Sequence, residues 1–313
     1  MSKIAFLFPG QGSQAVGMGK DLVEASAMAK AIFQEADHAL NFSLSKLCFE
    51  GPEDDLKLTT NTQPAILTTS IAALRVFQEQ VAIEVAYVAG HSLGEYSALV
   101  CSGALSFADA AQTVRKRGQF MQEAVPVGVG AMAAIMNLEQ ATIEELCQRV
   151  SKESHLVALA NLNSPDQYVI SGHVDAVNQV VELAKSAGAK RAMLLPVSAP
   201  FHCALMKPAA ERLQDVLNAV PFSDLSIPLM NNAEADILMS GAAARASLVR
   251  QMYKSVQWEL SMRKLIEQGV TTFIEFGPGK VLTGLLKRIE KTAVGLNVSD
   301  LKTLESVAQT LKG

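Results

Sequence analysis

A serine stands between two glycines in the segment Gly90-His91-Ser92-Leu93-Gly94. An apolar run over 85–89 precedes it and a helix-favouring run over 96–101 follows it, so the pattern predicts strand, sharp turn and helix. Such an elbow strains the serine backbone and needs small residues two positions away. The helix N-terminus behind it offers free N–H groups to an oxyanion. We expect Ser92 to be a nucleophile in acyl transfer; the alternative is a glycine-rich turn without chemistry.

A serine nucleophile needs a general base, and the chain has five histidines. His91 is adjacent to Ser92, and since neighbouring side chains diverge, we expect it to pack or to shape the turn. His202 lies among apolar residues where a predicted small domain rejoins the main one, so it is the predicted base; a buried histidine without a catalytic role is the alternative. An α/β-hydrolase places an acid between its serine and a late histidine, and that order is missing here. The other three histidines lie among polar residues and are expected to be solvated: His38, His155 and His173.

The helix predicted over 107–123 carries an arginine that leans toward the apolar face of the helix. That face consists of residues at helical spacing: Phe107, Ala110, Ala111, Val114, Gly118 and Met121. Because successive residues rotate by about 100°, Arg117 returns to the flank of this face while its two basic neighbours point away. A buried charge needs an anion. We therefore expect Arg117 to form either a structural salt bridge or a bidentate clamp on a substrate carboxylate.

The predicted first strand, 4–8, ends in a loop in which Gly10, Gly12 and Ala15 match the pattern G-x-G-x-x-A. This pattern is typical of dinucleotide binding, but the second strand with an acid about 20 residues later is missing. Residues 28–40 look helical instead. We expect these glycines to allow a backbone N–H to approach the reacting carbonyl instead.

Alternating strand and helix patterns run along most of the chain and predict an α/β fold. Apolar strands without polar alternation favour a parallel sheet covered by helices on both faces. The middle of the chain has the order βαββαβ, typical of a ferredoxin-like module, with strands over 129–136, 156–161, 167–171 and 191–195 and helices over 139–150 and 174–187. We predict a hydrolase-like large domain from residues 1–127 and 200–313 and an inserted ferredoxin-like small domain from residues 128–199. The active site is expected in the cleft between them.

The composition argues against several classes of protein. The chain has 313 residues, a formal net charge of −4 and 5% aromatic residues, so a face for nucleic acid is not expected. No stretch approaches the roughly 20 apolar residues of a membrane span, and the first apolar run is too short for a signal peptide. Four cysteines lie far apart without metal spacing. We therefore expect reduced thiols and a cytoplasmic protein.

Together these motifs resemble those of the malonyl-CoA:acyl carrier protein transacylases of fatty-acid synthesis. The matching segments are FPGQGSQ at 8–14, GHSLGE at 90–95, Arg117, NSP at 163–165, PFH at 200–202 and FGPG at 276–279. They occur in the same order and extend over essentially the whole chain. The resemblance implies a hydrolase-like α/β domain with a ferredoxin-like insert. It also implies that Ser92 is the nucleophile, that His202 is its base and that Arg117 binds the malonyl carboxylate.

The same resemblance implies roles for residues around this group. The backbone amides of Gln11 and Leu93 would form the oxyanion hole. The family has no carboxylate as a third member, and a backbone carbonyl near Gln251 would orient the histidine. Phe201 looks like the form that selects malonyl over branched groups. The chain departs from the family at two positions, Cys203 for a frequent serine and Ser255 for a common proline.

The resemblance implies transfer of malonyl from malonyl-CoA to the phosphopantetheine thiol of holo acyl carrier protein, through a malonyl-serine and without a cofactor or metal. A monomer without nucleic-acid or membrane partners is expected, although the sequence leaves the oligomeric state open. A serine acyl-thioester hydrolase and a catalytically inactive docking subunit remain alternatives. Because the acceptor is expected to be acidic, docking needs a local basic patch; scattered solvated charge is the alternative. The candidates for the patch are Lys190, Arg191, Lys280, Lys287 and Arg288.

Overall fold

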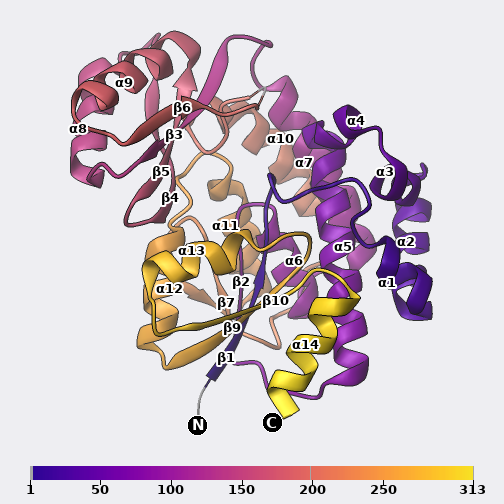
Figure 1. Cartoon of the computed structure of the whole chain (residues 1–313). Helices are drawn as coiled ribbons and strands as arrows, with labels where there is room; N and C mark the ends of the chain where they lie inside the picture. Colours follow the sequence, from indigo (N-terminus) through magenta and orange to yellow (C-terminus); the bar gives the residue numbers. More distant parts are fainter. Residues whose placement is uncertain (1–2, 198, 313) are drawn as a thin grey trace.

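Two separate sheets organise the computed structural model, which describes residues 3–197 and 199–312 (Figure 1). The larger sheet has the strand order β10-β9-β1-β2-β7-β8 and the smaller has the order β4-β5-β3-β6. The strands of the larger sheet are β1 (Lys3–Phe8), β2 (Tyr87–Gly90), β7 (Leu229–Met230), β8 (Ile237–Leu238), β9 (Val270–Phe276) and β10 (Val294–Val298). All neighbours in this sheet pair in parallel except β7 and β8, which are antiparallel. The predicted parallel sheet is therefore confirmed, with one antiparallel edge strand added.

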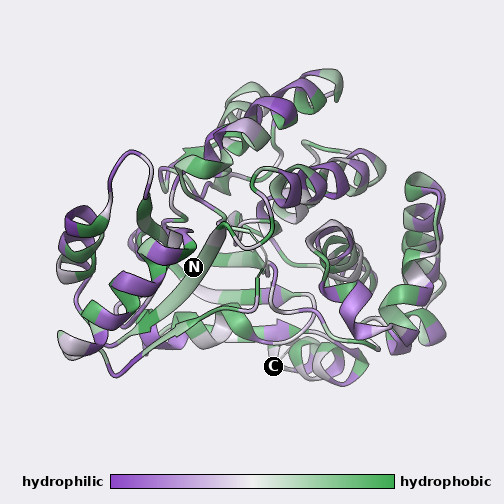
Figure 2. Ribbon diagram, turned by 90° about the horizontal axis from the view of Figure 1, so that it is seen from above, coloured by the Kyte–Doolittle hydropathy of each residue, from purple (hydrophilic) through white to green (hydrophobic). Residues whose placement is uncertain are grey.

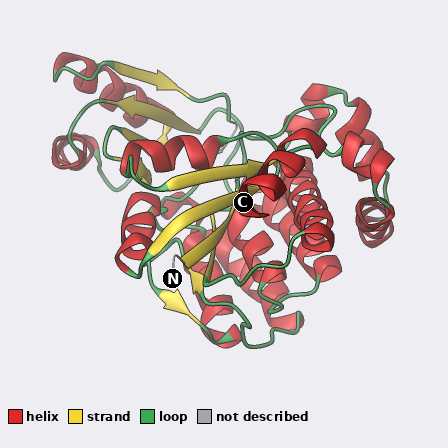
Figure 3. Ribbon diagram, turned by 60° about the horizontal axis from the view of Figure 1, so that its bottom comes forward, coloured by secondary structure: helices red, strands yellow, loops and turns green. Residues whose placement is uncertain are grey.

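Helices cover both faces of the larger sheet (Figure 3). Successive side chains of a strand point to opposite faces, and β1 illustrates the consequence. Phe6 and Phe8 enter the core cluster beneath α2, α5, α6 and α7, whereas Ala5 and Leu7 enter the cluster beneath α12 and α13. These helices are α2 (Ala27–Leu40), α5 (Thr59–Gln80), α6 (Gly94–Cys101), α7 (Phe107–Glu123), α12 (Trp258–Glu267) and α13 (Val281–Ile289). Since both faces are buried, β1 is apolar throughout instead of alternating.

The remaining helices of the large domain lie around this sheet, and Figure 2 shows that the surrounding helices carry both hydrophilic and hydrophobic residues. They are α1 (Lys20–Ala25), α3 (Leu44–Glu50), α4 (Glu53–Lys57), α10 (Lys207–Ala219), α11 (Gly241–Gln251), α14 (Leu301–Lys312) and a short 3₁₀ helix over Ala204–Met206. Within the described ranges, no helix combines the length and apolarity needed to cross a membrane.

The small domain has the predicted βαββαβ order, in the elements β3 (Gly130–Met136), α8 (Gln140–Val150), β4 (Val157–Ser164), β5 (Gln167–His173), α9 (Val174–Ser186) and β6 (Arg191–Leu194). Its strands pair antiparallel, with β3 and β5 in the centre, as a ferredoxin-like module requires. The two helices and four strands bury a hydrophobic cluster of their own. β4 runs to Ser164, three residues beyond the prediction, so the hairpin to β5 is tight.

The small domain joins the large one through two adjacent chain segments and along the edge strand β4. A Cβ atom on Gly130 would lie 2.3 Å from the Pro200 ring, so the outgoing and returning chains touch. Ser198, inside the returning segment, lies outside the described residues. On β4, the Leu162 N–H donates to the Val256 carbonyl at 2.9 Å, and the Val256 N–H donates to the Ala160 carbonyl at 2.8 Å. These bonds fix the small domain over one end of the large sheet.

Candidate active site

The structure contains the predicted elbow between β2 and α6. Ser92 has a φ of 52°, in the left-handed region that L-residues rarely adopt. A Cβ on Gly90 would lie 1.9 Å from the backbone carbon of Gly94, and one on Gly94 would lie 2.0 Å from the Phe8 carbonyl oxygen. Only glycine fits at these two positions, because β1, β2 and α6 meet there. The turn thereby projects the Ser92 hydroxyl into a cavity.

His202 lies beside this hydroxyl although it is 110 residues away in sequence. Its Nε2 is 2.8 Å from Ser92 Oγ, and its Nδ1 is 2.8 Å from the backbone carbonyl oxygen of Gln251. A carbonyl oxygen only accepts, so Nδ1 carries the proton and Nε2 presents a lone pair to the serine O–H. Burial, with the nearby positive charge of Arg117, lowers the pKa of His202 to about 3. The imidazole is therefore neutral near pH 7 and can accept the serine proton.

Arg117 approaches the same serine from helix α7 and is 1% exposed. Its Nη2 donates to Ser92 Oγ at 3.0 Å and to Gln251 Oε1 at 2.9 Å, and its Nη1 donates to Gln63 Oε1 at 2.8 Å. Among the described residues no carboxylate forms a salt bridge with Arg117, so the structural ion pair considered from the sequence is absent there. Burial lowers the pKa of Arg117, yet a guanidinium keeps its proton in proteins. The charge is held by neutral oxygens and remains available to an anion in the cavity.

Gln11 and Leu93 line the same cavity as Ser92. In the described part of the chain, neither backbone N–H has a recorded hydrogen-bond acceptor. The loop after β1 approaches the elbow closely, because a Cβ on Gly10 would lie 2.5 Å from the His91 carbonyl oxygen. Turns, not a helix, follow this loop, and α1 begins only at Lys20, so the helix required by a dinucleotide fingerprint is missing.

The cavity around Ser92 has a volume of about 110 Å³ and is lined by residues of both the large and the small domain. Its polar groups come from the large domain, apart from Asn161. The small domain and its returning segment add the apolar side chains Met132, Leu195 and Val197 to the wall. Phe201, next to the histidine, also lines it and is 7% exposed. The site therefore combines a nucleophile, a base and a buried cation in a small, largely apolar space.

His91 points away from the serine hydroxyl, as expected of its place in the turn. Its Nε2 is 2.8 Å from Asn163 Oδ1 on β4, and its ring packs at 5.4 Å from that of Trp258. Burial lowers the pKa of His91, so the neutral ring donates to the asparagine oxygen. This bond connects the elbow to the small domain.

Sequence reasoning missed two amides that hold the site together. Gln63 accepts the Arg117 Nη1 bond, and Asn232 accepts the Ser92 backbone N–H at 2.6 Å while donating to the Gly90 carbonyl at 2.7 Å. Asn232 follows β7 at the carboxyl edge of the sheet, where the ends of parallel strands meet. The sequence contains this signal, because a polar residue directly after a predicted strand is a candidate for the site. Gln63 gives no such signal, since it lies inside the long helix α5.

The basic residues considered for docking differ in their surroundings. Arg288 forms an ion pair with Asp166 of the small domain at 2.6 Å and donates to Gln167 Oε1 at 2.7 Å. The charge of Arg288 is thus paired across the contact between the two domains. Lys287 is exposed and has no ion pair among the described residues. The remaining candidates are also exposed: Lys190, Arg191 and Lys280.

Comparisons with known proteins cover nearly the whole chain. The sequence model of a family described as "Acyl transferase domain" matches residues 5–312. A protein of Bacillus subtilis (strain 168) named malonyl CoA-acyl carrier protein transacylase is 54% identical over 312 residues, covering 100% of this chain and 98% of the relative.

Two solved structures are similarly close. An acyl carrier protein S-malonyltransferase from Vibrio cholerae is 48% identical with a TM-score of 0.95, covering 98% of this chain and 100% of that one. A malonyl-transacylase solved in complex with a holo type II PKS acyl-carrier protein is 45% identical with a TM-score of 0.96, covering 99% of this chain and 100% of that one.

Proposed function

Since the chain belongs to the acyl transferase domain family, we propose that it transfers a malonyl group from malonyl-CoA to the phosphopantetheine thiol of acyl carrier protein by way of an ester on Ser92. One observation carries this proposal. The buried, carboxylate-free guanidinium of Arg117 donates directly to the oxygen of the nucleophile. A carboxylate bound there is held within reach of Ser92, as a thioester with a second carboxylate requires.

In the first half of the cycle, Ser92 Oγ attacks the thioester carbonyl of malonyl-CoA while its proton passes to His202 Nε2. The tetrahedral oxyanion is stabilised by the free N–H groups of Gln11 and Leu93. The carbon–sulfur bond then breaks, and the CoA thiol leaves with the proton from His202. Arg117 keeps the malonyl carboxylate in place. The product is malonyl-Ser92.

In the second half, the phosphopantetheine thiol gives its proton to His202 and attacks the serine ester. The same two amides stabilise the second oxyanion, and Ser92 recovers its proton as the ester bond breaks. Transfer must be faster than hydrolysis. The apolar wall formed by Met132, Leu195 and Val197 limits water around the ester.

Three further features complete the proposal. The reaction as written uses only groups of the chain and its two substrates, and no cofactor. A cytoplasmic place of action is supported by the free thiols of all four cysteines: Cys48, Cys101, Cys147 and Cys203.

The proposed domain division separates residues 1–127 with 200–313 from residues 128–199. It is supported by the separate sheet and the separate hydrophobic cluster of the second part.

Intact-mass spectrometry tests the proposal. Incubation with malonyl-CoA should add one malonyl group to the wild type and none to Ser92→Ala, and holo acyl carrier protein should then remove it. Loss of the nucleophile should reduce turnover by on the order of 10⁶-fold. Release of free malonate at a rate unaffected by the carrier protein would instead identify a hydrolase. Carrier-protein binding without any covalent adduct on the wild type would identify a docking subunit.

A further inference from the structure

A buried carboxylate lies behind the elbow and takes no part in the steps above. Glu95 is on the first turn of α6 and is 0% exposed. An isolated carboxylate in such a place is costly, so its partners indicate what the charge does there. Its Oε2 accepts from Gln251 Nε2 at 2.9 Å and from the backbone N–H of Asn232 at 3.0 Å. Its Oε1 has no partner among the described residues.

The first bond determines which way the Gln251 amide points. Gln251 Nε2 donates to Glu95 and to the Ser92 carbonyl oxygen, both at 2.9 Å, which leaves Oε1 toward Arg117 Nη2. If the amide rotated by 180°, its oxygen would face two acceptors and its NH₂ would face a guanidinium donor. Glu95 therefore favours the one orientation in which Gln251 can hold Arg117.

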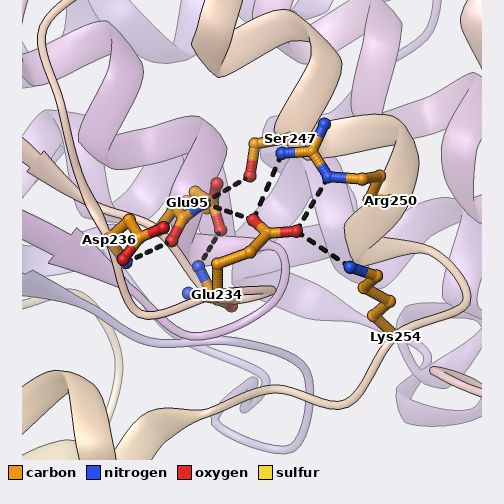
Figure 4. A network of polar contacts seen from close by, with 8 residues as sticks. Glu95, Glu234, Asp236, Ser247, Arg250 and Lys254 are labelled. Carbon is orange, nitrogen blue, oxygen red and sulfur yellow. Dashed lines mark hydrogen bonds and ion pairs between the residues drawn. The ribbon is translucent and has the colours of Figure 1, made fainter.

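The second bond of Glu95, from the Asn232 backbone N–H, fixes the residue that supports the backbone of the elbow. Asn232 Oδ1 accepts the Ser92 N–H, and the neighbouring Asn231 is itself tied to Glu234 and Ser247. Figure 4 shows Glu95 and Glu234 in one network of polar contacts, in which Arg250 and Lys254 both pair with Glu234. Asn232 thus belongs to a segment held at several points, and Glu95 joins α6 to it.

We propose that Glu95 is a positioning residue that fixes Gln251 and Asn232, and through them the Arg117 guanidinium and the Ser92–His202 pair, so that selectivity for malonyl over acetyl depends on it. The inference rests on the proposed malonyl transfer. Gln251 contacts both functional groups, because its side chain accepts a bond from Arg117 and its backbone carbonyl accepts one from His202 Nδ1. The connection to Arg117 matters more for malonyl than for acetyl, since only malonyl brings a carboxylate, whereas the connection to His202 serves both acyl groups.

The position needs a hydrogen-bond acceptor, and the charge is secondary. Burial raises the pKa of Glu95 to about 7, opposed by the bonds from Gln251 and Asn232 and by Arg117. A protonated carboxyl still offers an accepting oxygen in place of Oε2. Glu95→Gln should therefore keep both bonds with its carbonyl oxygen, whereas Glu95→Met fills the space and accepts neither.

The test measures kcat/KM for malonyl-CoA and for acetyl-CoA with holo acyl carrier protein, per mole of enzyme that can be acylated. For Glu95→Met we expect the malonyl-to-acetyl ratio to fall by about 10- to 100-fold, since small displacements of positioned groups have costs of this order. Glu95→Gln should restore the ratio to within about threefold of the wild type. Glu95→Ala, which removes the acceptor without adding an apolar group, should repeat the fall if Glu95→Met does not fold.

Glu275→Met is the matched control. Glu275 is also a 0% exposed carboxylate that accepts two backbone N–H bonds, from Leu282 and Thr283, but it caps α13 and lies outside the cavity lining. Its loss should lower stability and leave the malonyl-to-acetyl ratio unchanged. A wild type without a malonyl adduct would defeat the proposed function. A normally labelled wild type with an unchanged ratio in Glu95→Met, or with Glu95→Gln as impaired as Glu95→Met, would overturn the inference alone.

In a double-mutant cycle, Gln251→Leu removes the side chain through which Glu95 reaches Arg117. Adding Glu95→Met to Gln251→Leu should change the malonyl-to-acetyl ratio by less than about threefold, because the connection is already broken. Fully additive falls in the ratio would show that Glu95 acts on selectivity without Gln251 and would contradict the proposed route.

Discussion

The two walls of the active-site cavity are built on different principles. On the large-domain side, Ser92, Arg117 and Gln251 form a continuous set of buried hydrogen bonds. On the small-domain side, the wall is mainly apolar, and its polar link to the elbow is the bond between Asn163 and His91. Since buried polar networks specify one geometry whereas apolar walls tolerate exchange, the first side should set the chemistry and the second the shape.

The difference extends to the cores behind the two walls. The large-domain side chains of the site lie on or beside elements that share one hydrophobic cluster: β2, α6, α7 and α11. The small domain has its own hydrophobic cluster, and it meets the large one through bonds along β4 and at Arg288 and through three residues that join the large cluster, Met132, Ala160 and Val169. Substitutions on the large-domain side should therefore change selectivity and rate, and those on the small domain mainly stability and substrate affinity.

Among substitutions that keep both Ser92 and His202, Arg117→Ala should have the largest effect on the large-domain side. Among the described residues that line the cavity, Arg117 is the only Lys or Arg, so kcat/KM for malonyl-CoA should fall by roughly 10²- to 10³-fold, as expected when one partner of a buried charged pair is lost. Transfer of acetyl, which brings no carboxylate, should change by less than about tenfold. Steady-state kinetics with both thioesters measures this. An equal loss for the two acyl groups would mean that Arg117 only supports the structure of the site.

The pH dependence of acylation tests the electrostatics of the same side. Because burial and Arg117 lower the pKa of His202 to about 3, the base stays neutral as the pH falls through 6.5. We expect kcat/KM for malonyl-CoA to be flat from pH 8 down to about pH 5, whereas an unshifted histidine would cause a tenfold fall per unit below 6.5. A stopped-assay profile with circular dichroism at each pH separates protonation from unfolding. An acidic limb centred near 6.5 in folded enzyme would contradict this environment for His202.

The same shift affects stability with a defined sign. In the unfolded chain His202 takes up a proton near pH 6.5, but in the folded protein it does so only near pH 3. The folded state is therefore progressively disfavoured as the pH falls from about 6.5 toward 3. His202→Gln should reduce this loss, which chemical denaturation at pH 7 and pH 5 would reveal as a smaller difference between the two pH values.

The sequence predicted the parts of the site that depend on local backbone geometry. The glycines at 90 and 94 identify the elbow because no other residue fits there, and helical rotation places Arg117 on the inner flank of α7. The order βαββαβ was sufficient for the ferredoxin-like module, since its strands and helices follow each other along the chain. The resemblance then supplied the role of the carbonyl at Gln251.

The sequence could not predict the bonds that connect distant residues. Gln63 meets Arg117 across 54 residues and Glu95 meets Gln251 across 156, and no local pattern records such side-chain pairs. Glu95 stands directly before the helix-favouring run at 96–101, and this position was a sign in the sequence that its carboxylate is buried. A buried carboxylate requires hydrogen-bond partners, but the sequence does not show which residues they are. The antiparallel edge strand β8 was missed because two residues are too few to show a period.

Asn163→Ala tests the small-domain wall. It removes the acceptor of the bond from His91 Nε2, leaving a partly buried N–H without a protein partner, so the free energy of unfolding should fall by about 1 kcal/mol. Because Asn163 touches neither Ser92 nor Arg117 in the recorded bonds, the malonyl-to-acetyl ratio should be unchanged. Denaturant unfolding and the two-substrate assay measure both quantities. A marked fall in the ratio would show that the small domain also sets selectivity.

The smallest expected effect lies at the surface contact between the domains. Arg288→Gln removes an ion pair whose two side chains are each one-third exposed, so the loss of stability should be at most about 1 kcal/mol and should shrink at high salt. Lys287→Gln, which removes a neighbouring exposed charge without an ion pair among the described residues, is the control and should leave thermal unfolding unchanged. Arg288→Gln could instead weaken the affinity for carrier protein more than Lys287→Gln does, with the stability unchanged. That result would mean that Arg288 serves the contact with the partner more than the contact between the domains. The comparison of the two walls would then have to assign carrier-protein docking to the small-domain side.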